Sequence, residues 1–557
     1  MPNYATPGVF VEEITKFPPS VAQVPTAIPA FMGRTEKTLD NLGNSLVNKA
    51  IRIGSQKEYE QKFGFGPQPV ISQINLDADN NFVSAVIGAS NRHYLYDAIR
   101  LFYANGGGDC YIVSVGDYDD TVSDTAYTGV GAALEVVAKI DEPTILLFPD
   151  AANLAANLLS NVQKAALLQC GLLKDRVAIF DTRSDDYNGA TFRTNIGIND
   201  LKYGAAYTPW LSTALPKNIS YANLRGAIIS KNGGPLVTLN NTSIHGGNPD
   251  IVAILNLYNA HLNWRAEYAT YIAAGAPNEA NLDAAFTALD ALVTAPAATV
   301  AAKAPYTAAQ NAYQAAQNAT TKAALENTFA TLNNLITQIY GGEQGLMDSF
   351  GVYKAIIAGI NATPVEVPPS GAVAGIYAYV DRTRGVWKAP ANVSLNGVIG
   401  PTTAFSSSEL DALNIDVNAG KSINAIRTFT GKGTLVWGAR TLAGNDNEWR
   451  YVPVRRFYNM VEESIKKACE QFVFEPNDAN TWVRVQAMIE NFLLLQWRDG
   501  ALQGAKPEHA FFVSVGLGKT MTAQDILEGR MIVEIGMAPV RPAEFIILRF
   551  SQKMAES

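Results

Sequence analysis

The 557-residue sequence predicts a mixed α/β (α+β) protein built from several domains. Short apolar strands alternate with amphipathic helices over roughly the first third of the chain, which is typical of a partly parallel sheet covered by helices. An alanine-rich stretch, Asn281–Ile339, has the composition of helices. The length exceeds what one hydrophobic core usually holds, so about two to four domains are expected.

The first part of the chain predicts a regular alternation of elements. A strand is expected at Thr26–Gly33, and a helix capped by Ser55 is expected to reach Phe63. A helix at Tyr94–Ala104 is expected to stop at three glycines, with a strand following at Cys110–Val115. The alternation continues with a strand at Thr144–Pro149, a helix at Val162–Leu172 and a strand at Arg176–Asp181.

The pattern loosens after about Asp185. A buried strand is expected at Gly204–Leu211 and a helix at Ile251–Tyr271. Between them, Leu224–His245 is expected to form loops and short strands. Asn281–Ile339 predicts a helical hairpin broken near Pro296 and Pro305, with a shared apolar stripe.

The C-terminal part follows a stiff connector at Pro364–Pro369. It predicts a strand at Gly433–Ala439, an amphipathic helix at Arg456–Phe474, a helix capped by Asn477-Asp478 and closed by Gly500, and strands at Phe511–Gly516 and Arg530–Met537.

Composition excludes several classes of function. A net charge of −8 gives no reason to expect contact with nucleic acid. Cys110, Cys170 and Cys469 lack metal-ligand spacing and predict free thiols in a reducing compartment. We expect no secretion signal and no membrane insertion by this chain, because the N-terminus lacks a basic segment before an apolar one and no apolar run reaches about 18 residues.

No catalytic, cofactor or metal site is predicted. The histidines, His93, His245, His261 and His509, are spaced for neither a metal nor a nucleophile. The run Gly516-Leu517-Gly518-Lys519-Thr520 partly matches a phosphate-binding loop, but the glycine needed five residues before Gly518 is Val513. We interpret Gly516–Thr520 as a turn. The glycine run at Gly106–Asp109 is also interpreted as a turn, because it lies between a helix and a strand, the reverse of the order in a dinucleotide-binding loop. A phosphate- or nucleotide-binding α/β enzyme using the Gly516–Thr520 loop stays as an alternative.

Both termini predict strands without a partner in their own domain. The N-terminal segment comprises Val9, Phe10, Val11, Glu12, Glu13 and Ile14, and the C-terminal one comprises Glu544, Phe545, Ile546, Ile547, Leu548, Arg549 and Phe550. Soluble proteins usually hide such edges. Strands at both ends therefore predict a subunit that pairs its ends with neighbouring copies, in a head-to-tail contact that builds a filament when it does not close.

Longer motifs resemble one known family. Several segments are similar to the signature of contractile tail sheath proteins. They are Pro369–Gly375, Val380-Asp381, Arg384–Asn392, Phe474–Asn477 with Thr481-Trp482, and Gly536–Phe550. Tyr4–Glu13 also resembles the start of these sheaths, which occur in contractile phages, R-type pyocins and phage-like extracellular injection systems.

The resemblance implies a multidomain tail-sheath fold and a structural, non-enzymatic role. The chain is expected to polymerise helically with itself around an inner tube protein, between baseplate and terminal cap proteins. Contraction of the metastable extended lattice would drive the tube and spike through a target envelope without nucleotide hydrolysis. Assembly in the bacterial cytoplasm is implied, followed by presence in a phage tail or a released particle.

The expected domains are an N-terminal arm and linker at 1–25, an α/β middle domain at 26–183 closed by about 346–379, an outer insertion at 184–345, and an inner C-terminal domain at 380–557. Thr15–Val24 and Met537–Pro542 are expected as flexible linkers to the exchanged strands. The tube-facing candidates are Glu463, Lys466, Lys467 and Glu470 on one helix face. A further alternative is a monomeric carbohydrate- or surface-binding tail component with the insertion as its binding module.

Overall fold

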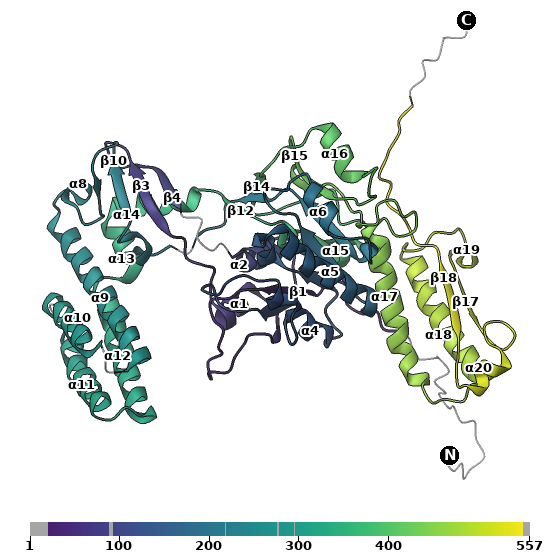
Figure 1. Cartoon of the computed structure of the whole chain (residues 1–557), viewed down its shortest axis with the longest axis horizontal. Coiled ribbons are helices and arrows are strands. Elements are labelled where there is room, and N and C mark those ends of the chain that lie inside the picture. The colour runs from purple at the N-terminus through teal and green to yellow at the C-terminus, as the bar shows by residue number, and fades with distance from the viewer. Residues whose placement is uncertain (1–20, 88–92, 218, 276–277, 294–295, 550–557) are drawn as a thin grey trace, which may run out of the picture. The chain divides into compact units, whose positions relative to one another are not determined.

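The computed structural model describes residues 21–87, 93–217, 219–275, 278–293 and 296–549. The chain forms two compact units (Figure 1). Unit 1 comprises Met1–Gly66, His93–Thr213 and Glu366–Ser557, and unit 2 comprises Pro67–Arg92 and Ala214–Val365. Each unit is described by itself below.

Unit 1 is built around a sheet with the strand order β13-β16-β15-β8-β7-β6-β1-β5-β2. In chain order these strands are β1 (Pro29–Gly33), β2 (Ala50–Ile53), β5 (Cys110–Ser114), β6 (Ile145–Leu147), β7 (Val177–Asp181), β8 (Gly204–Thr208), β13 (Val393–Ser394), β15 (Asn424–Phe429) and β16 (Gly433–Val436). The run from β15 to β5 is parallel, whereas β2, β13 and β16 pair antiparallel. The predicted partly parallel α/β layer is therefore confirmed.

Helices cover both faces of this sheet. On one face α4 (Ala133–Ala138) and α5 (Ala156–Leu173) pack on inward residues such as Leu146 and Ala178. On the other face lie α2 (Leu95–Ala104) and α15 (Ser370–Arg384), and the ring of Phe102 on α2 meets that of Phe31 on β1 edge to face at 5.3 Å. Because both faces are covered, β1, β7 and β8 are buried along their whole length and consist mainly of apolar residues.

The glycines of the Pro369–Gly375 motif allow α15 to lie against α2. A Cβ atom at Gly371 would stand 2.4 Å from the carbonyl oxygen of Ala98, and one at Gly375 would stand 2.6 Å from that of Phe102. Only glycine permits so close an approach of two backbones. The motif therefore has a packing role in the body of unit 1.

The remaining elements of unit 1 are short. They are α1 (Gln56–Phe63), α3 (Thr125–Thr128), α6 (Ala190–Asn195), β9 (Leu211–Thr213), β12 (Val365–Val367, at the boundary), β14 (Val398–Pro401), α16 (Ser407–Asn414), α19 (Pro507–Ala510), α20 (Ala523–Leu527), and 3₁₀ turns at Pro149–Asn153, Leu201–Tyr203 and Glu470–Phe472. The predicted cap of α1 is confirmed, because the Ser55 side chain accepts a hydrogen bond from the amide of Glu58.

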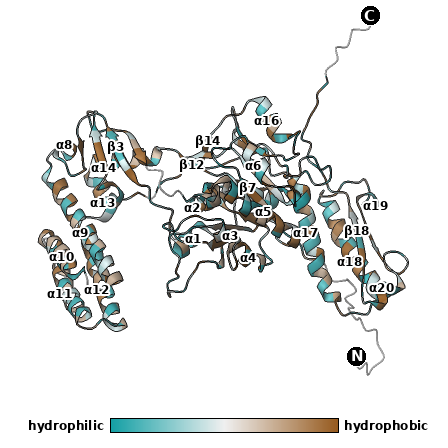
Figure 2. Ribbon diagram, in the orientation of Figure 1, coloured by the Kyte–Doolittle hydropathy of each residue, from teal (hydrophilic) through white to brown (hydrophobic). Residues whose placement is uncertain are grey.

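The C-terminal lobe of unit 1 has its own hydrophobic core. It consists of α17 (Val452–Cys469), α18 (Ala479–Arg498) and the antiparallel pair β17 (Phe511–Val515) and β18 (Val533–Met537). The core includes Phe457, Val461 and Ile465 of α17, so the predicted apolar face is confirmed. The Asp478 cap of α18 is also confirmed. Figure 2 shows the mixture of hydrophobic and hydrophilic turns along α17 and α18.

Unit 2 combines a small sheet with a set of helices. The sheet order is β11-β10-β3-β4, from β3 (Ile71–Leu76), β4 (Phe82–Ile87), β10 (Ile228–Lys231) and β11 (Leu236–Val237). The helices are α7 (Tyr221–Leu224), α8 (Thr242–His245), α9 (Pro249–Ala274), α10 (Glu279–Leu292), α11 (Ala297–Ala315), α12 (Ala319–Ile339), α13 (Gly342–Ser349) and α14 (Gly351–Ala362). The ring of Trp264 on α9 packs against those of Phe286, Tyr306 and Phe329.

The helical hairpin prediction for Asn281–Ile339 is wrong in detail. The segment forms α10, α11 and α12, and α11 runs through Pro305 without ending. Tyr306 and Ala309, which follow this proline, are buried and anchor the helix on the core, so the missing backbone hydrogen bond does not break it.

The expected domain boundaries also need correction. The insertion begins at Ala214 instead of 184, because β8 extends the main sheet beside β7. It also includes Pro67–Arg92, since β3 pairs with β10, and the stretch from 346 to 365, since α13 and α14 pack on the same core as β3. Residues 380–557 do not separate as a domain, because β15 pairs with β8 and thereby joins the main sheet.

Candidate assembly interface

The chain after β18 stays attached to the lobe as far as Glu544. The amides of Ala538 and Val540 donate to the carbonyl oxygens of Ala510 and Ala501, and the Arg541 guanidinium donates to the carbonyl of Asn447. Met537–Pro542, expected as a flexible linker, is therefore bound to its own subunit. The expectation is wrong because Leu502 and Gln503 supply it with backbone partners.

The Glu544 carboxylate is held by side chains from distant parts of unit 1. Arg440 donates from Nε to Oε1 and Oε2 at 2.9 and 3.1 Å, and from Nη2 to Oε2 at 2.6 Å. Asn414 donates to Oε1 at 2.9 Å, and the Tyr451 hydroxyl donates to Oε2 at 3.2 Å. Burial acts to raise the pKa of Glu544, but the hydrogen bonds from Arg440 and Asn414 outweigh it and lower the pKa below its usual value.

The exposed arm begins one residue later, at Phe545. Phe545, Ile546, Ile547 and Leu548 have exposed fractions of 65, 80, 78 and 72%, whereas the Glu544 side chain has 21%. The arm forms no strand in residues 545–549, and Phe550 lies outside the described residues. Four consecutive large apolar side chains in water are costly, about 1.5–3 kcal/mol each relative to burial, so this segment fits a partner surface.

Glu544 therefore differs from its predicted place in the exchanged strand. Its side chain binds the body of its own subunit. The sequence pattern missed Arg440, Asn414 and Tyr451, because they stand 93 to 130 residues away from Glu544 and carry no local signal.

The root of the N-terminal arm is also fixed. Val9–Ile14 and the start of the expected linker lie outside the described residues, which begin at Val21. The Val24 amide donates to Ser464 Oγ at 3.0 Å, and Thr26 Oγ1 donates to Asp381 at 2.5 Å. Arg456 donates to the carbonyl of Thr26 at 2.9 Å and to both oxygens of Asp381.

The β17–β18 pair offers open edges for added strands. No other strand in the described part of the chain pairs with β17 or β18. One face packs on the lobe core through Val513. On the other face the half-exposed Phe512 ring covers Gly536, where a Cβ atom would stand 2.1 Å from the ring. A lone pair of strands is marginally stable in water, so further strands would complete this sheet.

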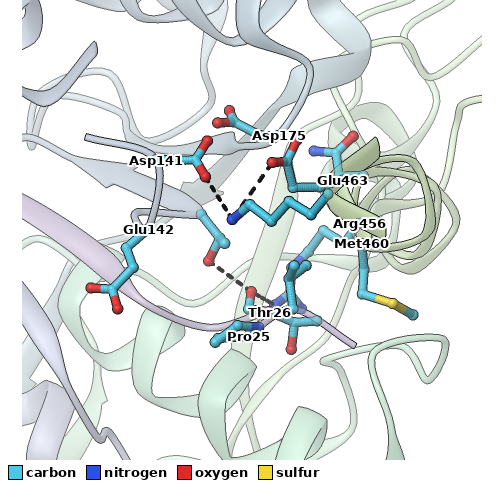
Figure 3. Close-up of a pocket in the computed structure, with 12 residues that line it drawn as sticks. Pro25, Thr26, Asp141, Glu142, Asp175, Arg456, Met460 and Glu463 are labelled. Atoms are coloured by element: carbon cyan, nitrogen blue, oxygen red, sulfur yellow. Dashed lines mark hydrogen bonds and ion pairs between the residues drawn. The ribbon is translucent and has the colours of Figure 1, made fainter. Parts of the chain in front are cut away.

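The tube-facing candidates do not share one exposed face. Lys466 and Glu470 are exposed, but the Glu463 side chain has an exposed fraction of only 9%. Lys467 bridges Glu463 at 3.6 Å and Asp141 at 2.6 Å, and Figure 3 shows both carboxylates converging on one ammonium group. The hydrogen bond from Lys467 lowers the pKa of Asp141. Glu463 and Lys467 therefore connect α17 to the loop before β6. Glu463 is buried and lies off the exposed face, whereas Lys467 is exposed like Lys466 and Glu470, so its contact with a tube stays a prediction.

A small cavity adjoins this bridge. Its volume is about 40 Å³, and Pro25, Thr26, Asp141, Arg456 and Met460 contribute to its lining (Figure 3). The cavity has room for a water molecule or two. It separates the N-terminal root from the loop at Asp141, and it is too small for an organic substrate.

The glycine-containing loops form turns. The carbonyl oxygen of Gly516 accepts hydrogen bonds from the amides of Lys519, Thr520 and Met521, and the Thr520 hydroxyl donates to the carbonyl of Ile532. These groups are engaged within the turn, so they form no phosphate cradle. The amide of Gly107 binds the carbonyl of Phe102, so the Gly106–Asp109 turn reverses the chain as predicted.

Groups that could hold a metal are not found among the described residues. None of the described helices combines the length and apolar composition that crossing a membrane requires. All three cysteines are free, with Cys110 and Cys170 buried and Cys469 half-buried. Burial raises the pKa of the Cys110 thiol to about 12, so this thiol is unreactive at neutral pH.

Comparison with known proteins identifies relatives. Residues 444–553 match the phage tail sheath C-terminal domain family. A putative prophage major tail sheath protein of Pseudomonas aeruginosa (strain UCBPP-PA14) is 26% identical over 183 residues, which cover 32% of this chain and 44% of that protein. The tail sheath protein of Burkholderia phage BcepMu is 31% identical over 150 residues, 26% of this chain and 31% of the relative. The matched segments thus span less than half of these relatives.

Solved structures match over almost the whole chain. The helical sheath of the anti-feeding prophage (AFP) in the contracted state has a TM-score of 0.57 and 26% identity, covering 99% of this chain and 100% of that chain. The PVC sheath complex of an extracellular contractile injection system, also contracted, has a TM-score of 0.54 and 25% identity, covering 99% of both chains.

Proposed function

We propose that this chain is a contractile tail sheath protein, the structural subunit of a sheath that polymerises helically around an inner tube. Its contraction drives the tube and spike through a target envelope. The role is mechanical, and the enzyme alternative finds no support, because the Gly516–Thr520 loop uses its own amides to close a turn.

The proposal rests most directly on the exposed C-terminal arm and the open β17–β18 sheet of the same chain. Phe545–Leu548 project four exposed apolar side chains from an anchored root, and the same lobe presents β17 and β18 with open edges. An extended arm and an incomplete sheet on one chain are complementary halves of a strand-exchange contact. Because the arm of one copy completes the sheet of another, the contact repeats and builds a helical polymer.

The energy for contraction comes from the lattice itself. An extended lattice is held kinetically, and rotation of the subunit bodies lets them pack more tightly while the exchanged strands keep neighbours connected. A gain of only about 1–3 kcal/mol per subunit, the size of one ordinary packing change, becomes large when it is summed over a long sheath. No nucleotide is needed.

The partners follow from this role. The chain assembles with further copies of itself and with a baseplate, and an inner tube protein and a terminal cap complete the particle. Assembly takes place in the bacterial cytoplasm, before the particle acts as part of a phage tail or as a released injection device. On α17, the exposed Lys466, Lys467 and Glu470 stay candidates for the tube-facing side.

Electron microscopy of the full chain co-expressed with the neighbouring tube and baseplate genes tests the proposal. Striated cylinders that occur in long and short forms are expected. A monodisperse monomer under these conditions would favour the surface-binding alternative. Tight Mg²⁺-dependent nucleotide binding that Lys519→Ala abolishes would instead favour the enzyme.

A further inference from the structure

We propose that the Glu544–Arg440 ion pair is the anchor that fixes where the C-terminal arm leaves its own subunit, and so sets the length of the connection between neighbouring copies. This inference rests on the proposed sheath function. It assigns a positioning role to residues that lie outside the exchanged strand.

The chain changes abruptly at Glu544 from a segment bound to the lobe to an exposed segment. Up to Val540 the backbone is hydrogen-bonded to the lobe, and Arg541 adds a side-chain contact. Among the described residues, the Glu544 carboxylate makes the last hydrogen bonds to the body. From Phe545 onward the described side chains are exposed. The boundary between fixed and free chain is therefore one residue wide.

The anchor itself has a defined geometry. The Arg440 side chain has an exposed fraction of 4%, so it is held in one place by its surroundings. It binds both carboxylate oxygens, and such two-pronged pairing fixes direction as well as distance. Asn414 orients the pair from both sides, since its side chain donates to Glu544 and its carbonyl accepts from Arg440 Nη1 at 3.2 Å.

In a lattice whose copies are linked by arms, the anchor sets the length of each link. If Glu544 were released, residues 542–544 would join the free segment and add up to about 10 Å of reach. A longer tether lowers the effective concentration of the arm at its acceptor, so neighbours would be held less tightly. A short and fixed connection transmits rotation of one subunit to the next.

The N-terminal root supports this interpretation independently. There the Arg456–Asp381 pair, with side-chain exposed fractions of 3 and 7%, fixes the chain at Thr26. Both terminal segments thus pass a buried arginine that binds a carboxylate. The anchors differ in one respect, because Glu544 is on the arm itself whereas Asp381 is on α15.

Amide hydrogen exchange of the full chain tests the anchor before assembly. In Glu544→Gln the amides of Ala538 and Val540 should exchange about ten-fold faster, because without the charged anchor the hydrogen-bonded segment before it opens locally more often. Arg440→Lys, which keeps the charge but not the fork, should give a smaller increase. Glu508→Gln, a change at an exposed glutamate of the same lobe, is the matched control and should leave exchange unchanged. Equal exchange in Glu544→Gln and the control would overturn the proposal.

Assembled sheaths test the consequence. Glu544→Gln sheaths, made with the tube and baseplate proteins, should contract at a lower urea concentration than Glu508→Gln sheaths. Identical thresholds would overturn the role of the anchor in the lattice. If even the unchanged chain forms no sheath, the proposed function fails, while the exchange measurement still decides whether the anchor exists.

Discussion

Arg456 binds Asp381 through two hydrogen bonds of 2.9 and 2.5 Å and so joins α17 to α15 beside the root of the N-terminal arm. Both side chains are almost completely buried. Breaking a buried pair leaves an uncompensated charge, whereas an exposed pair contributes little. The contact therefore links the C-terminal lobe to the body of unit 1.

Removal of this carboxylate should destabilise unit 1. We expect Asp381→Ala to lower the free energy of unfolding by about 3–5 kcal/mol, because Arg456 stays buried without its partner. Asp109→Ala is the matched control, since it breaks the exposed pair with Arg52 and should cost at most about 1 kcal/mol. Urea denaturation measures both values. Equal losses in the two variants would contradict the structural role of the buried pair.

Truncation separates folding from assembly. A chain ending at Glu544 keeps the anchor, and residues 545–549, the described part of what it loses, are exposed, so its free energy of unfolding should change by less than about 0.5 kcal/mol. It should form no sheaths. Deletion of Met1–Ile14 should have the same effect on assembly. Thermal denaturation and electron microscopy are the measurements, and long sheaths from either truncation would refute strand exchange.

The C-terminal anchor should depend on pH. The pKa of Glu544 in the folded chain is lowered, so its stabilising contribution is present above the ordinary glutamate pKa, about 4.3, and is lost as pH falls through the folded value. We expect protection of the Val540 amide, corrected for intrinsic exchange, to be constant from about pH 5 to 8 and to fall below about pH 4. In Glu544→Gln the acid-induced loss should be absent. A loss that persists in this variant would assign the effect to another group.

Unit 2 should lose stability at a milder pH. His261 accepts a hydrogen bond from the Tyr340 hydroxyl at 2.6 Å and donates to Asn333 at 2.9 Å, an arrangement that fits the neutral ring. Burial lowers the pKa of His261 to about 4. The unfolded chain therefore binds one more proton between about pH 6.5 and 4, and stability should fall by up to about 1.4 kcal/mol per pH unit as pH decreases. His261→Gln should flatten this dependence in thermal scans followed by Trp264 fluorescence, and an unchanged slope would contradict the assignment.

The aromatic core of unit 2 depends on the helices predicted as a hairpin. Trp264→Ala should cost about 3–5 kcal/mol, because the ring is fully buried and lies 4.4 Å from that of Phe329. Val300→Ala on the exposed face of α11 should cost less than about 0.5 kcal/mol. Deletion of Asn281–Ile339 would uncover Trp264. Assembly of this deletion variant therefore needs to be tested together with the folding of unit 2.

Local sequence patterns predicted the features that depend on neighbouring residues, such as helix caps and the apolar faces of helices. Ser55 and Asp478 cap the expected helices, and the apolar face of α17 follows from its helical spacing. The long motifs resemble the family whose C-terminal domain matches residues 444–553. The sequence did not predict contacts between segments that are far apart along the chain. Nothing near Glu463 indicates that Asp141 approaches Lys467 from another part of the chain, and nothing near Glu544 indicates Arg440.

The domain boundaries failed for a related reason. The sheet of unit 1 takes in β15 from far along the chain, and the pairing of Asn424 with Tyr207 is a parallel contact between strands more than 200 residues apart. Local composition indicates the strands themselves, but it does not indicate which of them become neighbours. The same limit hid the pairing of β3 with β10 in unit 2.

Cryo-electron microscopy of assembled particles measures the central claim most directly, because it traces both arms of each copy. We expect residues 545–549 and 9–14 to form strands in the β17–β18 sheets of adjacent copies, with Glu544 still bound to Arg440 of its own chain. Arms that fold back onto their own subunit and touch no second copy would contradict the account.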